Sequence, residues 1–122
     1  MPSPIRLQRI ADRIRRELSE MLIREIADPR LKNIYVTDVK VDRELAFADI
    51  YVSAVEGSAR RQEILEGLEH ARGFIRSMLA GRIELRVFPR LRFHWDPTPE
   101  HADHIERLLA SIRQKEKPED TE

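Results

Sequence analysis

Two segments rich in strand-forming residues, only three residues apart, constrain the fold of this 122-residue chain more than any other feature. Residues 34–41 and 45–55 contain many Val, Ile, Tyr and Phe residues, and the short connection Asp42-Arg43-Glu44 predicts an antiparallel hairpin. The second segment alternates on one face, with Ala46, Ala48, Ile50, Val52 and Ala54. The first segment breaks this alternation between Val36 and Val39, where we expect a β-bulge.

Helical patterns lie on both sides of the hairpin. From Pro4 to about Ile26, apolar residues recur at steps of three and four, which predicts an amphipathic helix with Ser3 as its N-cap. A second helical pattern runs from Ala59 to Ala80. We expect Ser58 to cap its start and Gly81 to end it.

Gly73 lies inside the second helical pattern, where glycine costs about 1 kcal/mol relative to alanine. The apolar spacing continues through it, with Ile64, Leu68, Ala71, Ile75 and Leu79. One interpretation is a kink at Ala71-Arg72-Gly73 that lets a phosphate or a sugar approach the main chain. The other is an unbroken helix in which glycine permits close packing on the sheet. The residues alone leave both interpretations open.

A third strand is expected over residues 84–88 and 91–95, with Pro89 indicating an edge strand or a bulge. Alternation places two sets of residues on opposite faces: Leu85, Val87, Leu91, Phe93 and Trp95 on one, and Arg86, Phe88, Arg90 and Arg92 on the other.

The C-terminal part starts with another helical pattern, from Thr98 onward. Its apolar residues are spaced to dock on the body: Ala102, Ile105, Leu109 and Ile112. The stretch 114–122 has no apolar residue, which predicts a disordered charged tail. We therefore expect one domain over residues 1–113, of α+β class, with a three-stranded sheet and helices on one face.

The composition and motifs favour a protein without catalytic chemistry. The chain has no cysteine, so disulfides and thiolate nucleophiles are excluded, and we expect a cytoplasmic protein because no signal peptide or membrane span is recognisable. No Gly-rich phosphate loop, GxSxG, HExxH or Rossmann motif is present. His101 and His104 lack an evident third ligand, so we expect no metal and no cofactor.

The charged residues are segregated, although the net charge is zero. Residues 71–95 contain six arginines and one acid, and Arg6, Arg9, Arg13 and Arg16 form a stripe along the first helix. Arginine suits phosphate and carboxylate, so an anionic partner is expected. Nucleic acid is the favoured partner. An acidic protein stays open as the alternative, as does a solvated arginine face balanced by Glu17 and Glu20.

Several stretches together resemble the ribosome-binding factor A family, bacterial assembly factors for the small ribosomal subunit. The resemblance covers about residues 6–96. Its stretches are the helix ending in Asp28-Pro29-Arg30, residues 36–53 (VTDVKVDRELAFADIYVS), residues 71–76 (ARGFIR) and residues 85–96 (LRVFPRLRFHWD).

The resemblance implies a type II KH-like fold, in the order helix, strand, strand, helix, kink, helix, strand, followed by a C-terminal helix. In the family an Ala-x-Gly kink joins the two helices, and Ala71-Arg72-Gly73 matches it. No heptad pattern or large exposed apolar stripe argues for a dimer, so we expect a monomer. The resemblance also implies a non-catalytic protein that binds the immature 30S subunit and 16S rRNA. It would assist late maturation and 5′-end processing, be associated with cold adaptation, and meet other assembly factors, including a GTPase.

On this interpretation the chain binds RNA through phosphate contacts spread over a wide surface and not through one pocket. The residues expected to make these contacts are Arg6, Arg9, Arg13, Arg16, Ala71, Arg72, Gly73, Arg76, Arg82, Arg86, Arg90 and Arg92.

Overall fold

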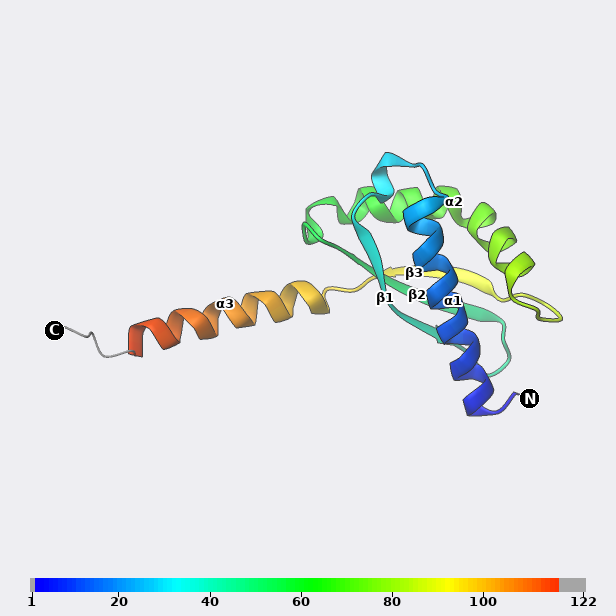
Figure 1. Ribbon diagram of the computed structural model, residues 1–122, viewed down its shortest axis with the longest axis horizontal. Helices are drawn as coiled ribbons and strands as arrows, with labels where there is room; N and C mark the ends of the chain where they lie inside the picture. The colour runs from blue at the N-terminus through cyan, green and yellow to red at the C-terminus, as the bar shows by residue number, and fades with distance from the viewer. Residues whose placement is uncertain (1, 117–122) are drawn as a thin grey trace.

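Two helices, α1 (Pro4–Arg24) and α2 (Arg61–Arg82), cover one face of a three-stranded sheet, and α3 (Thr98–Glu116) points away from it (Figure 1). The computed structural model describes residues 2–116. The strands are β1 (Ile34–Val41), β2 (Phe47–Ala54) and β3 (Arg90–Trp95), and short 3₁₀ turns, η1 (Pro29–Leu31) and η2 (Ser58–Arg60), precede β1 and α2. Buried apolar side chains of α1, α2 and the sheet form one core.

The sheet is mixed, with the strand order β1-β2-β3. β1 and β2 pair antiparallel, which confirms the predicted hairpin, whereas β2 and β3 pair parallel. The register shifts between Val36 and Asp38, which confirms the predicted bulge. β3 is an edge strand, as Pro89 indicated.

Helix α1 forms as the sequence predicts. Ser3 is its N-cap, accepting a hydrogen bond from the Arg6 amide at 3.2 Å, and Pro4 occupies the first turn. One side of the helix is buried against the sheet and α2, through Ile10, Ala11, Ile14, Leu18, Met21 and Leu22. The helix ends at Arg24, two residues before the predicted end.

Helix α2 is unbroken over 22 residues, so the prediction that Ala71-Arg72-Gly73 separates two helices is wrong. The apolar residues on both sides of Gly73 are fully buried: Ile64, Leu68, Ile75 and Leu79. Burying each contributes about 2 kcal/mol, which outweighs the cost of about 1 kcal/mol for glycine in a helix. The ribbon of α2 bends over the sheet but stays helical (Figure 1).

Both predicted ends of α2 need correction. Gly81 does not stop the helix, which continues to Arg82, where the amide of Ile83 still donates to the carbonyl of Leu79 at 2.9 Å. Ser58 does not cap α2, because it lies in η2 and its hydroxyl and amide donate to Glu100.

The third strand is shorter than predicted. Residues 84–88 are not a strand, so alternation does not carry across Pro89. Phe88 is therefore buried in the core and not interleaved with arginines, whereas Val87 is exposed.

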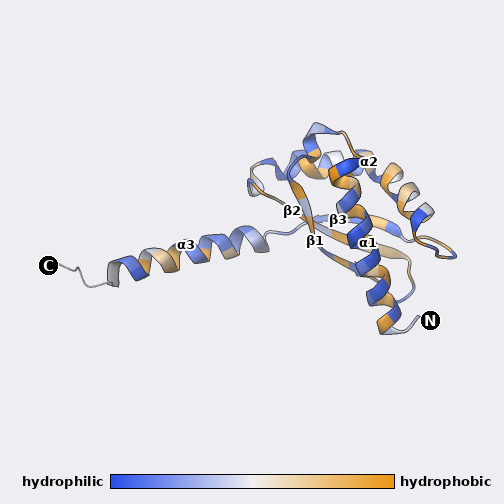
Figure 2. Ribbon diagram, viewed as in Figure 1, coloured by the Kyte–Doolittle hydropathy of each residue, from blue (hydrophilic) through white to orange (hydrophobic). Residues whose placement is uncertain are grey.

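Helix α3 does not dock on the body, contrary to the prediction. Figure 2 shows hydrophobic residues along α3, which stands away from the sheet. Four of them are about half exposed, namely Ile105, Leu108, Leu109 and Ile112. Residues 114–116 belong to this helix, which corrects the predicted start of the disordered tail, and residues 117–122 lie outside the described part of the chain. No helix within residues 2–116 combines the length and apolarity needed to cross a bilayer.

Candidate nucleic-acid interface

A hollow of about 610 Å³ lies between the middle of α2 and the start of β3. Its lining includes the predicted residues Arg72, Gly73, Arg76 and Arg90, together with Glu69 and Leu91. The pairing of β3 with β2 carries Arg90 to the side of α2 that bears Gly73, although the two residues are far apart in the sequence. The structure thus brings one third of the predicted site residues to one place.

Gly73 is exposed in this hollow, and packing does not explain it. A Cβ atom built on Gly73 would meet nothing within 4 Å, apart from its chain neighbours and the backbone of its own helix. The glycine that packing requires is Gly67, whose Cβ would lie 3.0 Å from Cδ2 of Leu31 and 3.3 Å from Cβ of Arg30. Of the two interpretations of Gly73, close packing is therefore wrong, and the open backbone remains available to a ligand.

The two arginines next to Gly73 have different environments. Arg72 is exposed, and its one ion pair within residues 2–116 is a loose contact of 3.5 Å with Glu69. Arg76 is half-buried and donates to the carbonyls of Phe88 and Pro89, from Nη2 at 2.5 Å and from Nε at 3.1 Å. Arg72 is thus available to an anion, whereas Arg76 fixes the segment that leads into β3.

The other arginines of this region divide in the same way. Arg86 and Arg90 are exposed and form no ion pair in the described part of the chain. Arg92 is bound to Asp49, to which it donates from Nε at 2.8 Å and from Nη2 at 3.0 Å. The hydrogen bond from Arg92, followed by that from His94, lowers the pKa of the Asp49 carboxyl, although partial burial opposes this.

The stripe on α1 is interrupted by one structural residue. Arg6, Arg9 and Arg16 are exposed, and no ion pair involves them within residues 2–116. Arg13 pairs with Glu17 at 3.3 Å and donates from Nη2 to the carbonyl of Arg82 at 3.0 Å. It therefore joins α1 to the end of α2.

Arg82 completes this contact from the α2 side. Its guanidinium lies between Glu17 and Glu25 of the α1 region, and the hydrogen bond to Glu25 raises the pKa of Arg82 above its ordinary value. Because both acidic side chains bind its guanidinium, Arg82 holds the end of α2 against the α1 region.

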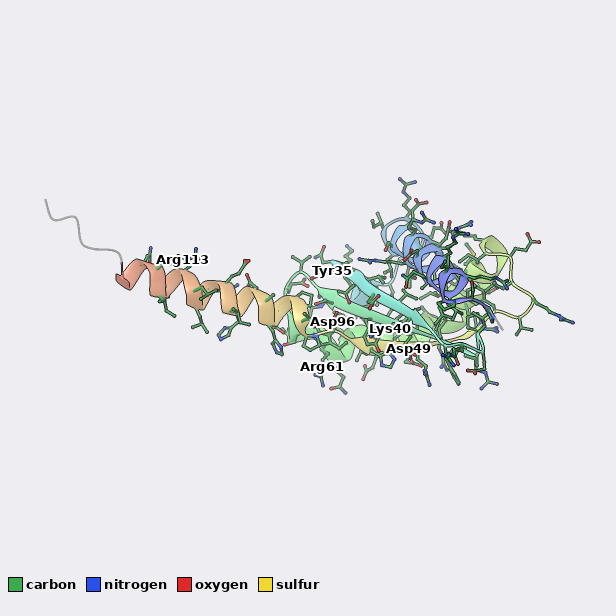
Figure 3. All side chains as sticks on the ribbon, turned by 90° about the horizontal axis from the view of Figure 1, so that it is seen from below. Tyr35, Lys40, Asp49, Arg61, Asp96 and Arg113 are labelled. Carbon is green, nitrogen blue, oxygen red and sulfur yellow. The ribbon has the colours of Figure 1, made fainter. Side chains whose placement is uncertain are left out.

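The sequence analysis missed a group of side chains on the sheet face that the helices leave open. Lys40 of β1 and Asp49 of β2 stand on this face (Figure 3), opposite one another in the register, and Asp49 in turn lies opposite Arg92. Strand alternation does place Asp49 and Tyr51 together, but only the parallel pairing of β3 with β2 brings Arg92 and His94 beside them.

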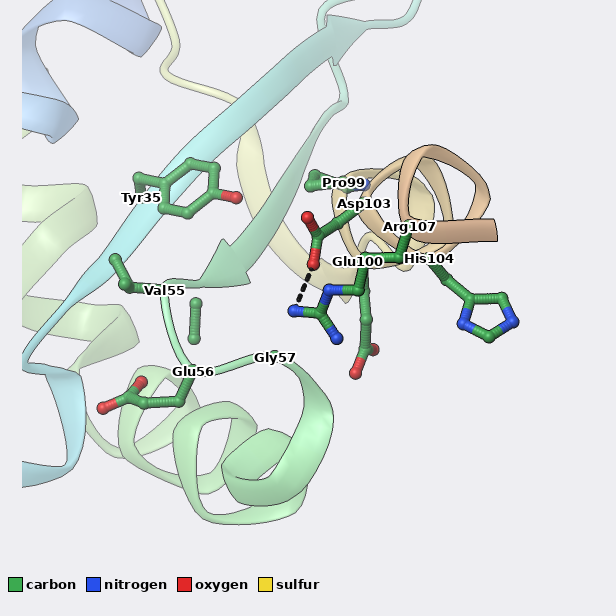
Figure 4. Close-up of a pocket in the computed structure, with 10 residues that line it drawn as sticks. Tyr35, Val55, Glu56, Gly57, Pro99, Glu100, Asp103, His104 and Arg107 are labelled. Atoms are coloured by element: carbon green, nitrogen blue, oxygen red, sulfur yellow. Dashed lines mark ion pairs between the residues drawn. The ribbon is translucent and has the colours of Figure 1, made fainter. Parts of the chain in front are cut away.

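A second hollow lies between the β2 end and the first turns of α3 (Figure 4). Three carboxylates line it, on Glu56, Glu100 and Asp103, and the guanidinium of Arg107 pairs with Asp103 at 2.6 Å. This excess of negative charge disfavours phosphate. Within residues 2–116, no group of three His, Asp or Glu side chains is placed to hold a metal ion.

Known proteins resemble this chain over most of its length. The model of the family "Ribosome-binding factor A" matches residues 6–109. Ribosome-binding factor A of Thiobacillus denitrificans is 41% identical over 104 residues, which is 85% of this chain and 84% of the relative.

Solved structures agree with this match. The crystal structure of ribosome-binding factor A from Thermus thermophilus superposes with a TM-score of 0.66 at 26% identity, covering 73% of this chain and 93% of that chain. A homology model of the Thermus thermophilus factor, fitted into a cryo-electron-microscopy map of a 30S complex, gives a TM-score of 0.56 at 28% identity and covers 68% of this chain and 87% of that one. These similarities confirm the expected α+β, KH-like fold.

Proposed function

The chain belongs to the ribosome-binding factor A family, and from this premise we propose that it binds the immature 30S subunit through 16S rRNA and assists late maturation, including 5′-end processing. The family consists of non-catalytic assembly factors. The protein would then act by binding RNA and not by cleaving it. It would act in the cytoplasm, where the small subunit is assembled.

The observation that carries this proposal is the open backbone at Gly73. A mid-helix glycine with free space in front of it and Arg72 and Arg90 beside it is suited to a phosphate or ribose, because both can approach the main chain there. A fold that needed glycine for packing would place a neighbour within contact distance, as it does at Gly67.

The binding surface that follows is smaller than the set of twelve predicted residues. Exposed arginines without a tight partner supply the phosphate contacts: Arg6, Arg9, Arg16, Arg72, Arg86 and Arg90. Arg13, Arg76 and Arg82 stabilise the fold, since carboxylates or carbonyls occupy their guanidinium groups. Because the contacts are dispersed, the affinity should fall steeply with salt, and losing one arginine should weaken it modestly.

Two further features of the proposal come from the family. Release from the subunit involves other assembly factors, including a GTPase, and the protein supports growth in the cold. A deletion strain complemented with this chain tests the second, because precursor 16S rRNA should accumulate at low temperature without it and disappear with it.

The direct test is co-sedimentation of the purified protein with isolated small subunits across a salt series, with large subunits as the control. Selective binding to small subunits that weakens with salt supports the proposal. Equal binding to both subunits, or none, contradicts it and favours an acidic protein as the partner of the arginine surface. Incubation with precursor rRNA and Mg²⁺ should yield no cleavage.

A further inference from the structure

The open face of the sheet carries a layered stack of side chains from all three strands. Nζ of Lys40 lies 5.4 Å from the ring centroid of Tyr51. The ring of Tyr51 also stacks with His94, with ring centroids 4.9 Å apart and an angle of 26° between the planes. The stack thus runs from β1 across β2 to β3 and ends on an imidazole.

The stack ends at the free edge of the sheet. β3 is an edge strand, so no further strand covers His94 among the described residues. Tyr51 occupies one side of its ring, no second aromatic partner exists within residues 2–116, and 39% of the side chain is exposed. A flat ring added beyond His94 would continue the stack without displacing a protein group.

One hydrogen-bond donor beside the stack is available to an anion. Asp49 lies beneath Arg92 and His94 and accepts from both, so only 19% of its side chain is exposed, compared with 48% for Arg92. Arg92 donates from Nε and Nη2 to Asp49, and its Cζ lies 4.0 Å from the ring centroid of Phe47. Its Nη1 donates to no acceptor among the described residues. Asp38 and Asp49 balance the charges of Lys40 and Arg92 on this face, so the group that can donate to an anion is Nη1 of Arg92.

Cross-strand pairs of this kind also stabilise sheets that bind nothing. The position of this one favours a ligand, because it adjoins the hollow at Gly73. Arg90 lines that hollow and stands two residues before Arg92 on the same edge strand. Arg90 and His94 lie about 13 Å apart along β3, so a nucleic-acid strand held at Gly73 can cross β3 and reach His94.

We propose that His94 stacks with an unpaired base of single-stranded RNA while Nη1 of Arg92 contacts a neighbouring phosphate. This proposal rests on the proposed function and deepens it, because it adds a base contact to a surface that otherwise binds only backbone. It also assigns the open sheet face, which the helices leave uncovered, to the same RNA strand.

The test compares two probes and two variants. The probes are a fluorescein-labelled short oligoadenylate and an abasic ribose-phosphate oligomer of the same length, bound at low salt and followed by anisotropy. His94→Leu should bind the oligoadenylate about tenfold more weakly, since stacking one base is worth about 1–3 kcal/mol. His94→Phe, which keeps the flat ring but loses the hydrogen bond to Asp49, should bind it like the parent protein. Both variants should bind the abasic oligomer equally well.

Unchanged binding by His94→Leu overturns the proposal, and so does an equal loss in both variants, because the second result would assign the effect to the Asp49 contact. The parent protein provides an independent readout: the imidazole proton signals of His94 should shift upfield when oligoadenylate is added and stay in place with the abasic oligomer. Arg72→Glu separates this proposal from the proposed function, because it should weaken both probes equally. If His94→Leu leaves small-subunit binding unchanged, the assembly role stands and the base contact is overturned.

Discussion

The hydroxyl of Thr37 lies 2.6 Å from Oδ2 of Asp96 and joins two strands that are not neighbours in the sheet. Thr37 stands in the bulge of β1, and Asp96 directly follows β3, so the contact spans β2. The bulge is what makes this reach possible, because it takes Thr37 out of the regular pairing with β2. The carboxylate also accepts from the amide of Thr98, and so fixes the turn from which α3 starts.

Thr37→Val should therefore destabilise the protein by about 1 kcal/mol at pH 7, a value below that of a buried bond to a charged group because the pair is partly exposed. The hydrogen bond from Thr37 is the main cause that lowers the pKa of Asp96. Its stabilisation is present above the ordinary carboxyl pKa of about 4 and is lost as the pH falls through the lowered folded pKa. Urea unfolding should thus show a difference at pH 7 that shrinks as the pH falls below about 4. Thr37→Ser, which keeps the hydroxyl, is the control and should behave like the parent protein throughout this pH range.

Gly67→Ala should lower stability, although alanine is the better helix former. The added Cβ would lie 3.0 Å from Leu31 and 3.3 Å from Arg30, and Leu31 is buried and has little room to move. Overpacking costs about 1–3 kcal/mol, against a gain of about 1 kcal/mol in helix propensity. Thermal unfolding measures the balance, and a higher midpoint than that of the parent protein would show that η1 moves away from α2 at little cost.

Arg82→Met should lower the unfolding midpoint and leave small-subunit binding unchanged for the fraction that is folded. The substitution removes the contacts with Glu17 and Glu25 that clamp α1 to α2 while keeping the aliphatic length of the side chain. Arg72→Glu combined with Arg90→Glu should do the reverse, with weaker binding, a flatter salt dependence and an unchanged midpoint. Salt-series sedimentation and urea unfolding of both proteins decide the matter. If fully folded Arg82→Met binds small subunits more weakly than the parent protein, Arg82 itself contacts the RNA.

The sequence predicted best those elements whose pattern is local. The α1 stripe, the hairpin and the bulge follow from the spacing of apolar residues along a single segment, and Ser3 and Pro4 identify the start of α1. The start of the third strand was predicted less well. Alternation was carried across Pro89 into residues that are not a strand, and this placed Phe88 on the wrong face.

The candidate site depended on information that the sequence does not contain. The sequence identifies the arginines but not the groups that they contact. In the structure, a carbonyl binds Arg76 and a carboxylate binds Arg82, whereas Arg72 makes only a loose contact. The apolar residues of α3 have the spacing of a helix that packs on a protein core. Nothing in the sequence shows that these residues stay exposed in the structure. His94 became a candidate only when the parallel pairing of β3 set it against Tyr51.

Gly73 provides the sharpest test, because the chain contains a matched control for it. Gly73 and Gly81 both lie within α2, and a Cβ at either position would meet nothing within 4 Å. Gly73→Ala and Gly81→Ala should each stabilise the protein by up to about 1 kcal/mol, the effect being smaller at Gly81 because it lies in the last turn. If RNA approaches the backbone at Gly73, Gly73→Ala alone should weaken small-subunit binding, while Gly81→Ala binds like the parent protein. Equal binding by the two variants would mean that the hollow is not a contact site. The RNA would then rest on the arginines of α1, because the fold by itself gives no reason for glycine at position 73.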